Sequence, residues 1–172
     1  LAQNENKFVT LPDDIFKADS IRVFTPDGGG QSGASIQVLM TGQPIGTFYT
    51  YKFAGKDENG VSQYVNSDGT VSSDIAELTV EDYQILGNAQ PKLLLGWNNN
   101  FKYGNFDLNL FFRGVFGNRI MNVTRADLFR PSTATINNIP VEAARESIDD
   151  FNSYQNSSPF LESGDYLRVD NQ

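Results

Sequence analysis

The chain has 172 residues, and its 21 Asp and Glu against 13 Lys and Arg give a formal net charge of -8. This acidic balance offers no basic footprint for a nucleic acid. Histidine and cysteine are both absent, which excludes Ser-His and Cys-His nucleophiles, the usual zinc sites and a disulfide framework. No run of about 18 apolar residues occurs, so the sequence predicts no transmembrane helix, and its length suffices for one domain with a core.

The first forty residues predict short strands separated by turns. Strand-like segments occupy residues 7–11, 19–25 and 34–40, where apolar and β-branched residues recur. The sequence PDGGG at residues 26–30 predicts a turn or a loop tip between the second and third of these segments. We therefore expect a β-rich start to the chain.

Residues 45–53 predict a strand that is rich in aromatic side chains. Thr47, Tyr49, Tyr51 and Phe53 share one face of it by two-residue alternation. Because Tyr and Phe are enriched in strands, we expect these rings to pack in a core or an interface. A surface that stacks sugars or binds peptides is the alternative, and the sequence does not choose between them.

Residues 57–82 predict a polar loop. Its central NSDGTV run resembles a calcium loop of the form D-x-[DN]-x-[DN]-G. When the run is aligned on its glycine, however, Tyr64 and Ile75 stand at the first and twelfth ligand positions, so two principal carboxylates are missing. We therefore expect an Asx-type turn and no cofactor, with calcium near Asn66 and Asp68 as the alternative.

Residues 92–117 predict a β-hairpin, with Gly104 and Asn105 as a two-residue turn because both residues tolerate a positive φ. Each arm has about the length of a tilted strand that crosses a bilayer, roughly 9–11 residues. The turn sets a register that pairs Tyr103 with Phe106, Phe101 with Leu108, Trp97 with Phe112, Leu93 with Phe116, Lys102 with Asp107 and Asn100 with Asn109. The first four pairs lie on an apolar face and the last two on a polar face.

The apolar face of this hairpin allows two interpretations. In a soluble sheet it lies against a core, and in a membrane barrel it lies against lipid. Alternation with a period of two is common to both. Soluble β-domains are commoner and the barrel signal is weak for each strand, so the pattern alone favours the soluble sheet.

Residues 118–159 predict a long connection, far beyond the usual length of about 4–6 residues, and connections of this size tend to be functional. The segment PVEAARESI at residues 140–148 is the convincing helix candidate within it, with Pro near its start and an acidic residue in its first turn. A further strand begins at Tyr166 and continues through Val169.

Four sequence motifs follow one another across nearly the whole chain: NENK at 4–7, GQPIGTFYTYKFAG at 42–55, LGNAQPK with LGWNNNFKYGNFDLNLFFRGVFGNRIMN within 86–122, and FLESGDYLRVDN at 160–171. In this order they resemble the C-terminal part of TonB-dependent outer-membrane transporters of the SusC/RagA type. In that family an LGN-x-x-PK segment leads into a Gly-aromatic strand, a hairpin, and a Gly-Asn that opens an external loop.

The resemblance implies an all-β fold, with antiparallel strands from a transmembrane β-barrel and long external loops; a soluble antiparallel β-sandwich is the alternative. Residues 1–172 would be a partial barrel segment, residues 92–117 a membrane hairpin and residues 118–159 a long external loop. A plugged barrel of this class needs about 22 strands, and the signal peptide, TonB-contacting segment and plug of the family have no counterpart in the sequence. We therefore expect an internal piece of a much larger protein, or a truncated product.

The resemblance also implies a function, as part of a TonB-energised importer in the cell outer membrane that takes up oligosaccharides or peptides. A SusD-like surface lipoprotein would act as its lid, TonB would be contacted through other parts of the protein, and the chain would not be an enzyme. Because barrel interiors are polar, the candidates for facing the lumen are Asn98, Asn100, Lys102, Asp107, Asn109 and Arg113. The alternatives are a secreted carbohydrate-binding β-domain and a glycoside hydrolase, for which the sequence pairs no specific acids.

Overall fold

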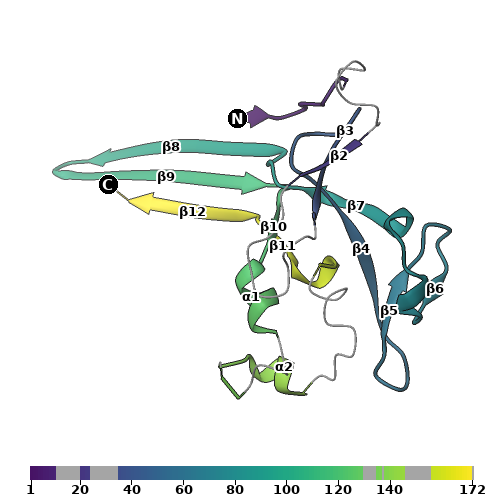
Figure 1. The fold of residues 1–172 in the computed structure, drawn as a ribbon. Coiled ribbons are helices and arrows are strands. Elements are labelled where there is room, and N and C mark those ends of the chain that lie inside the picture. The colour runs from purple at the N-terminus through teal and green to yellow at the C-terminus, as the bar shows by residue number, and fades with distance from the viewer. Residues whose placement is uncertain (11–19, 24–34, 130–134, 137, 146–155, 172) are drawn as a thin grey trace.

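The computed structural model describes residues 1–10, 20–23, 35–129, 135–136, 138–145 and 156–171, which form antiparallel sheets and two short helices (Figure 1). Every pairing between the described strands is antiparallel. No helix among these residues is long and apolar enough to cross a membrane. The predicted antiparallel β-fold is therefore confirmed at the level of its secondary structure.

The first sheet has four strands in the order β1-β8-β9-β12. Their bounds are Ala2–Gln3 for β1, Leu93–Tyr103 for β8, Phe106–Phe116 for β9 and Tyr166–Asn171 for β12. Figure 1 shows β8, β9 and β12 projecting together from the remainder of the molecule. The edge strands of this sheet, β1 and β12, thus lie near the N- and C-terminal ends of the sequence, and the predicted hairpin forms the two central strands.

The hairpin has the predicted turn and register. Gly104 adopts a φ of 58°, a left-handed value that costs little without a Cβ. Each predicted pair is directly opposite in the structure, from Tyr103 with Phe106 at the turn to Leu93 with Phe116 at the open end. The register prediction is therefore confirmed over all eleven residue pairs.

The second sheet has the strand order β2-β3-β4-β5-β6, and β7 pairs with β4. The bounds are Ser20–Val23 for β2, Gln37–Met40 for β3, Thr47–Lys56 for β4, Ser62–Val65 for β5, Val71–Ser72 for β6 and Tyr83–Asn88 for β7. Strands β2, β3 and β4 fall within or beside predicted segments.

Two predictions about these regions were wrong. Residues 57–82 are not a loop, because they contain β5, β6 and two 3-10 helices, η1 (Ile75–Glu77) and η2 (Val80–Asp82). Residues 7–10 form no strand, and residue 11 lies outside the described residues. Phe8 instead exchanges backbone hydrogen bonds with the turn after β3, donating to Gln43 O and accepting from Gly42 N at 2.8 Å each.

The connection at 118–159 carries more order than a loop. It contains β10 (Arg119–Met121) and two helices, α1 (Val123–Leu128) and α2 (Val141–Arg145). Helix α2 falls within the predicted helix, whose last three residues lie outside the described residues. The sequence interpretation missed α1, which begins where the Asn122 side chain accepts a hydrogen bond from Arg125 N at 2.9 Å.

A small core lies where this connection meets the second sheet. Strand β11 (Leu161–Ser163) pairs with β10, and the 3-10 helix η4 (Ser158–Phe160) precedes it. One buried cluster joins the two α-helices to η4 through Ala126, Phe129, Ala143 and Phe160, and another comprises Ile36, Phe48 and Leu161. The segment before β11 also binds β4, because Thr50 donates to the Asn156 carbonyl and Phe53 N donates to Ser158 Oγ.

Candidate functional site

The six predicted candidates lie on one face of β8 and β9, which we call the polar face. Direct pairing places Lys102 beside Asp107, with Nζ and Oδ1 3.6 Å apart, and Asn100 beside Asn109. Two-residue alternation then adds Asn98 and Arg113 to the same face. The structure thus brings the candidates together, while their exposure to a lumen remains a prediction.

Strand β12 adds two charged residues to the polar face that the sequence interpretation missed. Arg168 lies opposite Arg113, and Asp170 lies opposite Phe111. The Asp170 carboxylate is shared, with Oδ1 2.5 Å from Arg168 Nε and Oδ2 3.7 Å from an Arg113 Nη atom. The alternation of Leu167, Arg168, Val169 and Asp170 was a signal for both residues. All five charged side chains of the four-stranded sheet lie on this face.

The opposite surface of the sheet, the apolar face, is exposed although its side chains are large. Trp97 and Phe112 are directly opposite and stack with ring centroids 5.3 Å apart. Trp97 is 59% exposed, and Leu167 and Val169 from β12 are 60% and 53% exposed. Within the described ranges nothing covers this face, so the core that a soluble sandwich requires is not formed here.

Two strand glycines shape the two faces. On the apolar face a Cβ at Gly114 would lie 2.6 Å from Phe116 Cε2, so the missing side chain makes room for that ring. On the polar face a Cβ at Gly96 would lie 3.7 Å from Phe111 Cε2 and Cζ, which places the Phe111 ring over Gly96. Glycine inside a strand often marks such close approach.

The aromatic residues of β4 pack against one another. Tyr51 contacts Tyr83 and Tyr64 edge-on, with centroids 4.5 and 5.9 Å apart, and Phe53 contacts Tyr64 at 5.8 Å. Burial, followed by the neighbouring Tyr83, raises the pKa of Tyr51 to about 12. The guanidinium of Arg22 lies 4.3 Å from the Tyr83 ring centroid. The prediction that these rings serve packing is confirmed.

The NSDGTV run forms the turn between β5 and β6. Asp68 Oδ1 accepts hydrogen bonds from Thr70 N at 2.8 Å and from Thr70 Oγ1 at 2.6 Å, which lower the pKa of Asp68. Asp82 accepts from Thr79 N and Ser67 N, and these backbone donors lower the pKa of Asp82. No group of three or more acidic, His or Cys side chains among the described residues is placed to hold a metal ion.

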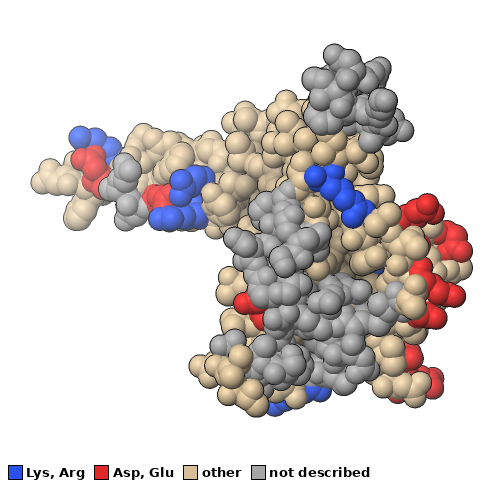
Figure 2. Space-filling model, viewed as in Figure 1, with Lys and Arg blue, Asp and Glu red and all other residues tan. Residues whose placement is uncertain are grey.

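Acidic side chains gather on residues 57–82, which we call the outer lobe (Figure 2). Residues 57–82 contain seven Asp and Glu and no Lys or Arg. They therefore carry most of the net charge of the chain, whereas cations and carboxylates alternate on the projecting sheet (Figure 2). The sheet and the outer lobe thus differ in electrostatic character.

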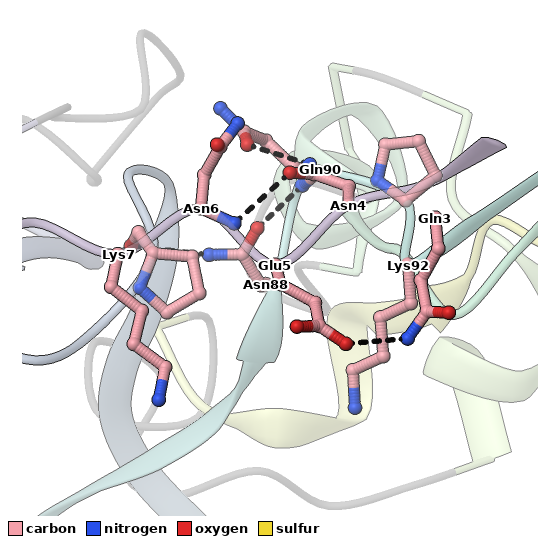
Figure 3. Close-up of a pocket in the computed structure, with 10 residues that line it drawn as sticks. Gln3, Asn4, Glu5, Asn6, Lys7, Asn88, Gln90 and Lys92 are labelled. Carbon is pink, nitrogen blue, oxygen red and sulfur yellow. Dashed lines mark hydrogen bonds between the residues drawn. The ribbon is translucent and has the colours of Figure 1, made fainter.

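A pocket of about 700 Å³ lies where the N-terminal segment crosses the link between β7 and β8 (Figure 3). Amide side chains form much of its wall. Asn4 Nδ2 donates to Gln90 Oε1 at 3.1 Å, Asn88 Oδ1 accepts from Gln90 N at 2.6 Å, and Gln3 Nε2 donates to Glu5 Oε1 at 2.6 Å. The NENK and LGNAQPK motifs are therefore neighbours, and their amides hold the crossing together.

Arg125 joins α1 to the segment that precedes β11. Its Nη1 donates to Pro159 O at 3.2 Å and lies 3.7 Å from Glu162 Oε1. The guanidinium carbon also lies 5.6 Å from the Phe129 ring centroid and 5.5 Å from that of Phe160. One side chain thus ties the helical region of the long connection to the strand that leads back to the sheet.

Sequence comparison finds similarity to two TonB-dependent receptors. No protein-family model matches it. TonB-dependent receptor P3 of Formosa agariphila is 28% identical over 194 residues, which cover 99% of this chain and 18% of the receptor. TonB-dependent receptor P26 of the same organism is 27% identical over 140 residues, covering 72% of this chain and 13% of the receptor. This chain is similar to TonB-dependent receptors.

The fold agrees with this relationship. The solved RagAB peptide transporter matches with a TM-score of 0.62 at 16% identity, covering 89% of this chain and 18% of the transporter chain. The RagAB peptide importer in its closed-closed state matches with the same score and identity, covering 90% and 18%. The expected resemblance to TonB-dependent transporters is thereby supported in sequence by two receptors and in fold by the RagAB transporter. The chain spans 18% or less of the length of each.

Proposed function

We propose that this chain forms part of the wall of an outer-membrane, TonB-dependent importer. The observation that carries the proposal is the division of the four-stranded sheet into two faces. Every charged residue of its strands lies on the polar face, and the apolar face is exposed. A barrel wall needs this division, because one face meets lipid and the other meets a wet interior.

The hairpin has the length that such a wall requires. Eleven residues at a rise of roughly 3.4 Å each extend over about 34 Å between the first and last Cα atoms. At a tilt of about 45° the strand rises about 24 Å, close to the apolar band of about 25 Å on outer-membrane barrels. One crossing therefore fits β8 and another fits β9.

Aromatic residues lie at the turn end of the hairpin, where a membrane interface would be. Tyr103 and Phe106 are directly opposite and are 87% and 79% exposed. Aromatic girdles at both interfaces are characteristic of outer-membrane barrels. Their place beside a two-residue turn supports a short turn on one side of the membrane, with residues 118–159 as the external connection on the other.

We propose the cargo and the partners by analogy with the transporters that the chain resembles. The importer would carry oligosaccharides or peptides, and the relatives that were solved structurally are a peptide transporter and a peptide importer. A SusD-like surface lipoprotein would close the external side, and TonB would supply the work through parts of the protein outside this chain. The contribution of residues 1–172 would be wall, lumen lining and external connection.

A spin-label scan of residues 97–101 in the full-length protein, reconstituted in lipid vesicles, tests the orientation. Labels at Trp97 and Phe101 should collide more with oxygen, which concentrates in lipid, and labels at Asn98 and Asn100 should collide more with a water-soluble nickel complex. The assignment of the faces would be refuted if Asn98 and Asn100 were the positions more accessible to oxygen, or if all five positions were equally accessible to both reagents.

Fractionation of the full-length native protein tests the location and the partner. The protein should leave the membrane only with detergent and should co-purify with a surface lipoprotein. Release into buffer as a compact monomer would instead support a soluble β-domain that shares ancestry with the transporters.

A further inference from the structure

The polar face of the sheet contains an unfavourable pairing that the wall function does not require. Arg113 and Arg168 are direct cross-strand partners on β9 and β12. Like charges in this position repel and destabilise the strand pair. Asp170 is the carboxylate in contact with both, and its two oxygens are divided between them.

The two guanidiniums retain open donors. The Arg113 and Arg168 side chains are 47% and 63% exposed, whereas that of Asp170 is 23% exposed. Arg113 approaches Asp170 at 3.7 Å, which is beyond a direct hydrogen bond. Over the four strands the polar face has three cations and two anions, a local excess of one positive charge in a chain of net charge -8. A second anion would relieve the repulsion.

A pocket of about 500 Å³ lies beside Arg113, within the usual size range of small-ligand sites of roughly 300–1,000 Å³. Its polar-face wall is largely apolar and is formed by Leu94, Gly96, Phe111, Val115 and Tyr166. Phe111 is 37% exposed over Gly96, and Tyr166 is 44% exposed. This wall lies beside the Arg113 guanidinium, and Arg168 lies directly across from Arg113 on β12. The arrangement fits a ligand with an apolar side and an anionic group.

We propose that Arg113 and Arg168 bind a carboxylate of the transported ligand, while Phe111 and Tyr166 contact the ligand's apolar side. We call this set of four residues the carboxylate site. The proposal rests on the proposed function, because the polar face must border the lumen to meet cargo. The recognised chemistry is a carboxylate next to an apolar surface, which an acidic sugar or a peptide terminus both provide.

Matched probes measure this recognition on the full-length protein in detergent. One pair is 4-nitrophenyl β-glucuronide with the corresponding β-glucoside, and the other is N-acetylphenylalanine with its amide. Within each pair the carboxylate is the difference. Binding by saturation-transfer NMR should favour the carboxylate member about tenfold or more, as expected for charge-assisted hydrogen bonds. A preference only in the first pair identifies an acidic sugar as the ligand, and a preference only in the second pair identifies a peptide terminus. A preference in both pairs shows that the carboxylate itself is recognised.

Three variants test which residues cause the preference for the carboxylate probe. Arg168→Gln should abolish it, and Asp170→Asn should increase it because both guanidiniums lose their internal competitor. Lys102→Gln is the control and should leave the preference unchanged. Lys102 is a cation on the same face, but it lies about 20 Å along β8 from Gly96, the residue directly opposite Arg113. The melting temperature of each variant is measured separately. If the ion pairs serve only to hold β9 against β12, the substitutions lower the melting temperature without changing the preference for the carboxylate probe.

Equal binding of the matched probes, or an undiminished preference in Arg168→Gln, would overturn the carboxylate site. So would a loss of preference in Asp170→Asn with an unchanged melting temperature. The spin-label scan keeps this failure distinct from failure of the wall assignment. If labels at Asn98 and Asn100 report water while the probes bind equally, the wall function stands and the carboxylate site falls.

Discussion

Two adjacent phenylalanines allow the proposed membrane orientation to be tested with matched substitutions. Phe111 lies at the centre of β9 on the polar face, and Phe112 is the next residue, on the apolar face. Replacing each by arginine introduces the same charge at almost the same depth. The two variants therefore differ in the side of the sheet to which the guanidinium points.

The expected difference is large. An arginine on the lipid face near the midplane of a barrel costs about 2–4 kcal/mol. Phe112→Arg also loses the stack with Trp97, worth about 0.5–1.5 kcal/mol. Phe111→Arg instead places its charge opposite Asp170, a favourable cross-strand pair. The membrane term alone corresponds to a ratio of about 30 to 900 in the folding equilibrium, at about 1.36 kcal/mol for each tenfold step.

The assay is the folded fraction of the full-length protein in outer membranes, read from its heat-dependent mobility on gels and from urea unfolding in vesicles. Phe112→Arg should reduce the folded fraction far more than Phe111→Arg. Phe111→Leu and Phe112→Leu serve as controls that retain apolar side chains. If the two arginine substitutions reduce the folded fraction equally, or if Phe111→Arg reduces it more, the apolar face does not meet lipid.

Three further predictions concern packing, the long connection and pH. A Cβ at Gly114 would collide with the Phe116 ring, so Gly114→Ala should lose about 1–3 kcal/mol by overpacking in a urea titration, whereas Gly96→Ala fits its site. Arg125→Ala removes the guanidinium that ties α1 to the segment before β11, and faster hydrogen exchange there should reveal a loss of about 1 kcal/mol. Backbone donors lower the pKa of Asp82, so its stabilisation is present above the ordinary carboxyl pKa of about 3.9 and is lost as pH falls through the lower folded-state pKa. Limited proteolysis of the outer lobe across this range should show the loss, and Asp82→Asn should reduce the pH dependence to the part that Asp68 contributes.

The hairpin was predictable because its determinants are local. A two-residue Gly-Asn turn fixes the register, and alternation over eleven residues then assigns every side chain to a face. A slip by one residue would move the apolar set to the opposite face. The same reasoning applies to α2, where Pro140 and an early acidic residue marked the start.

The errors arose where distant residues decide the structure. Strands β5 and β6 are short and polar in sequence, yet Tyr64 is fully buried because β4 supplies the rings around it. Helix α1 is six residues long, and its Ala126 packs with the adjoining Phe129 on Phe160 and Ala143 from later in the chain. Residues 7–10 instead pair through Phe8 with the turn after β3.

The two-faced hairpin, its register and the resemblance to TonB-dependent transporters could all be predicted from the sequence alone, because alternation, a turn and ordered motifs are properties of neighbouring residues. Which distant segments share those faces depends on the folded chain. The tertiary structure placed β12 beside β9, so that Asp170 joins two facing arginines, and it left the apolar face uncovered by the described residues. Strand order and burial depend on contacts between residues far apart in the chain, and these contacts form only when the whole fold assembles.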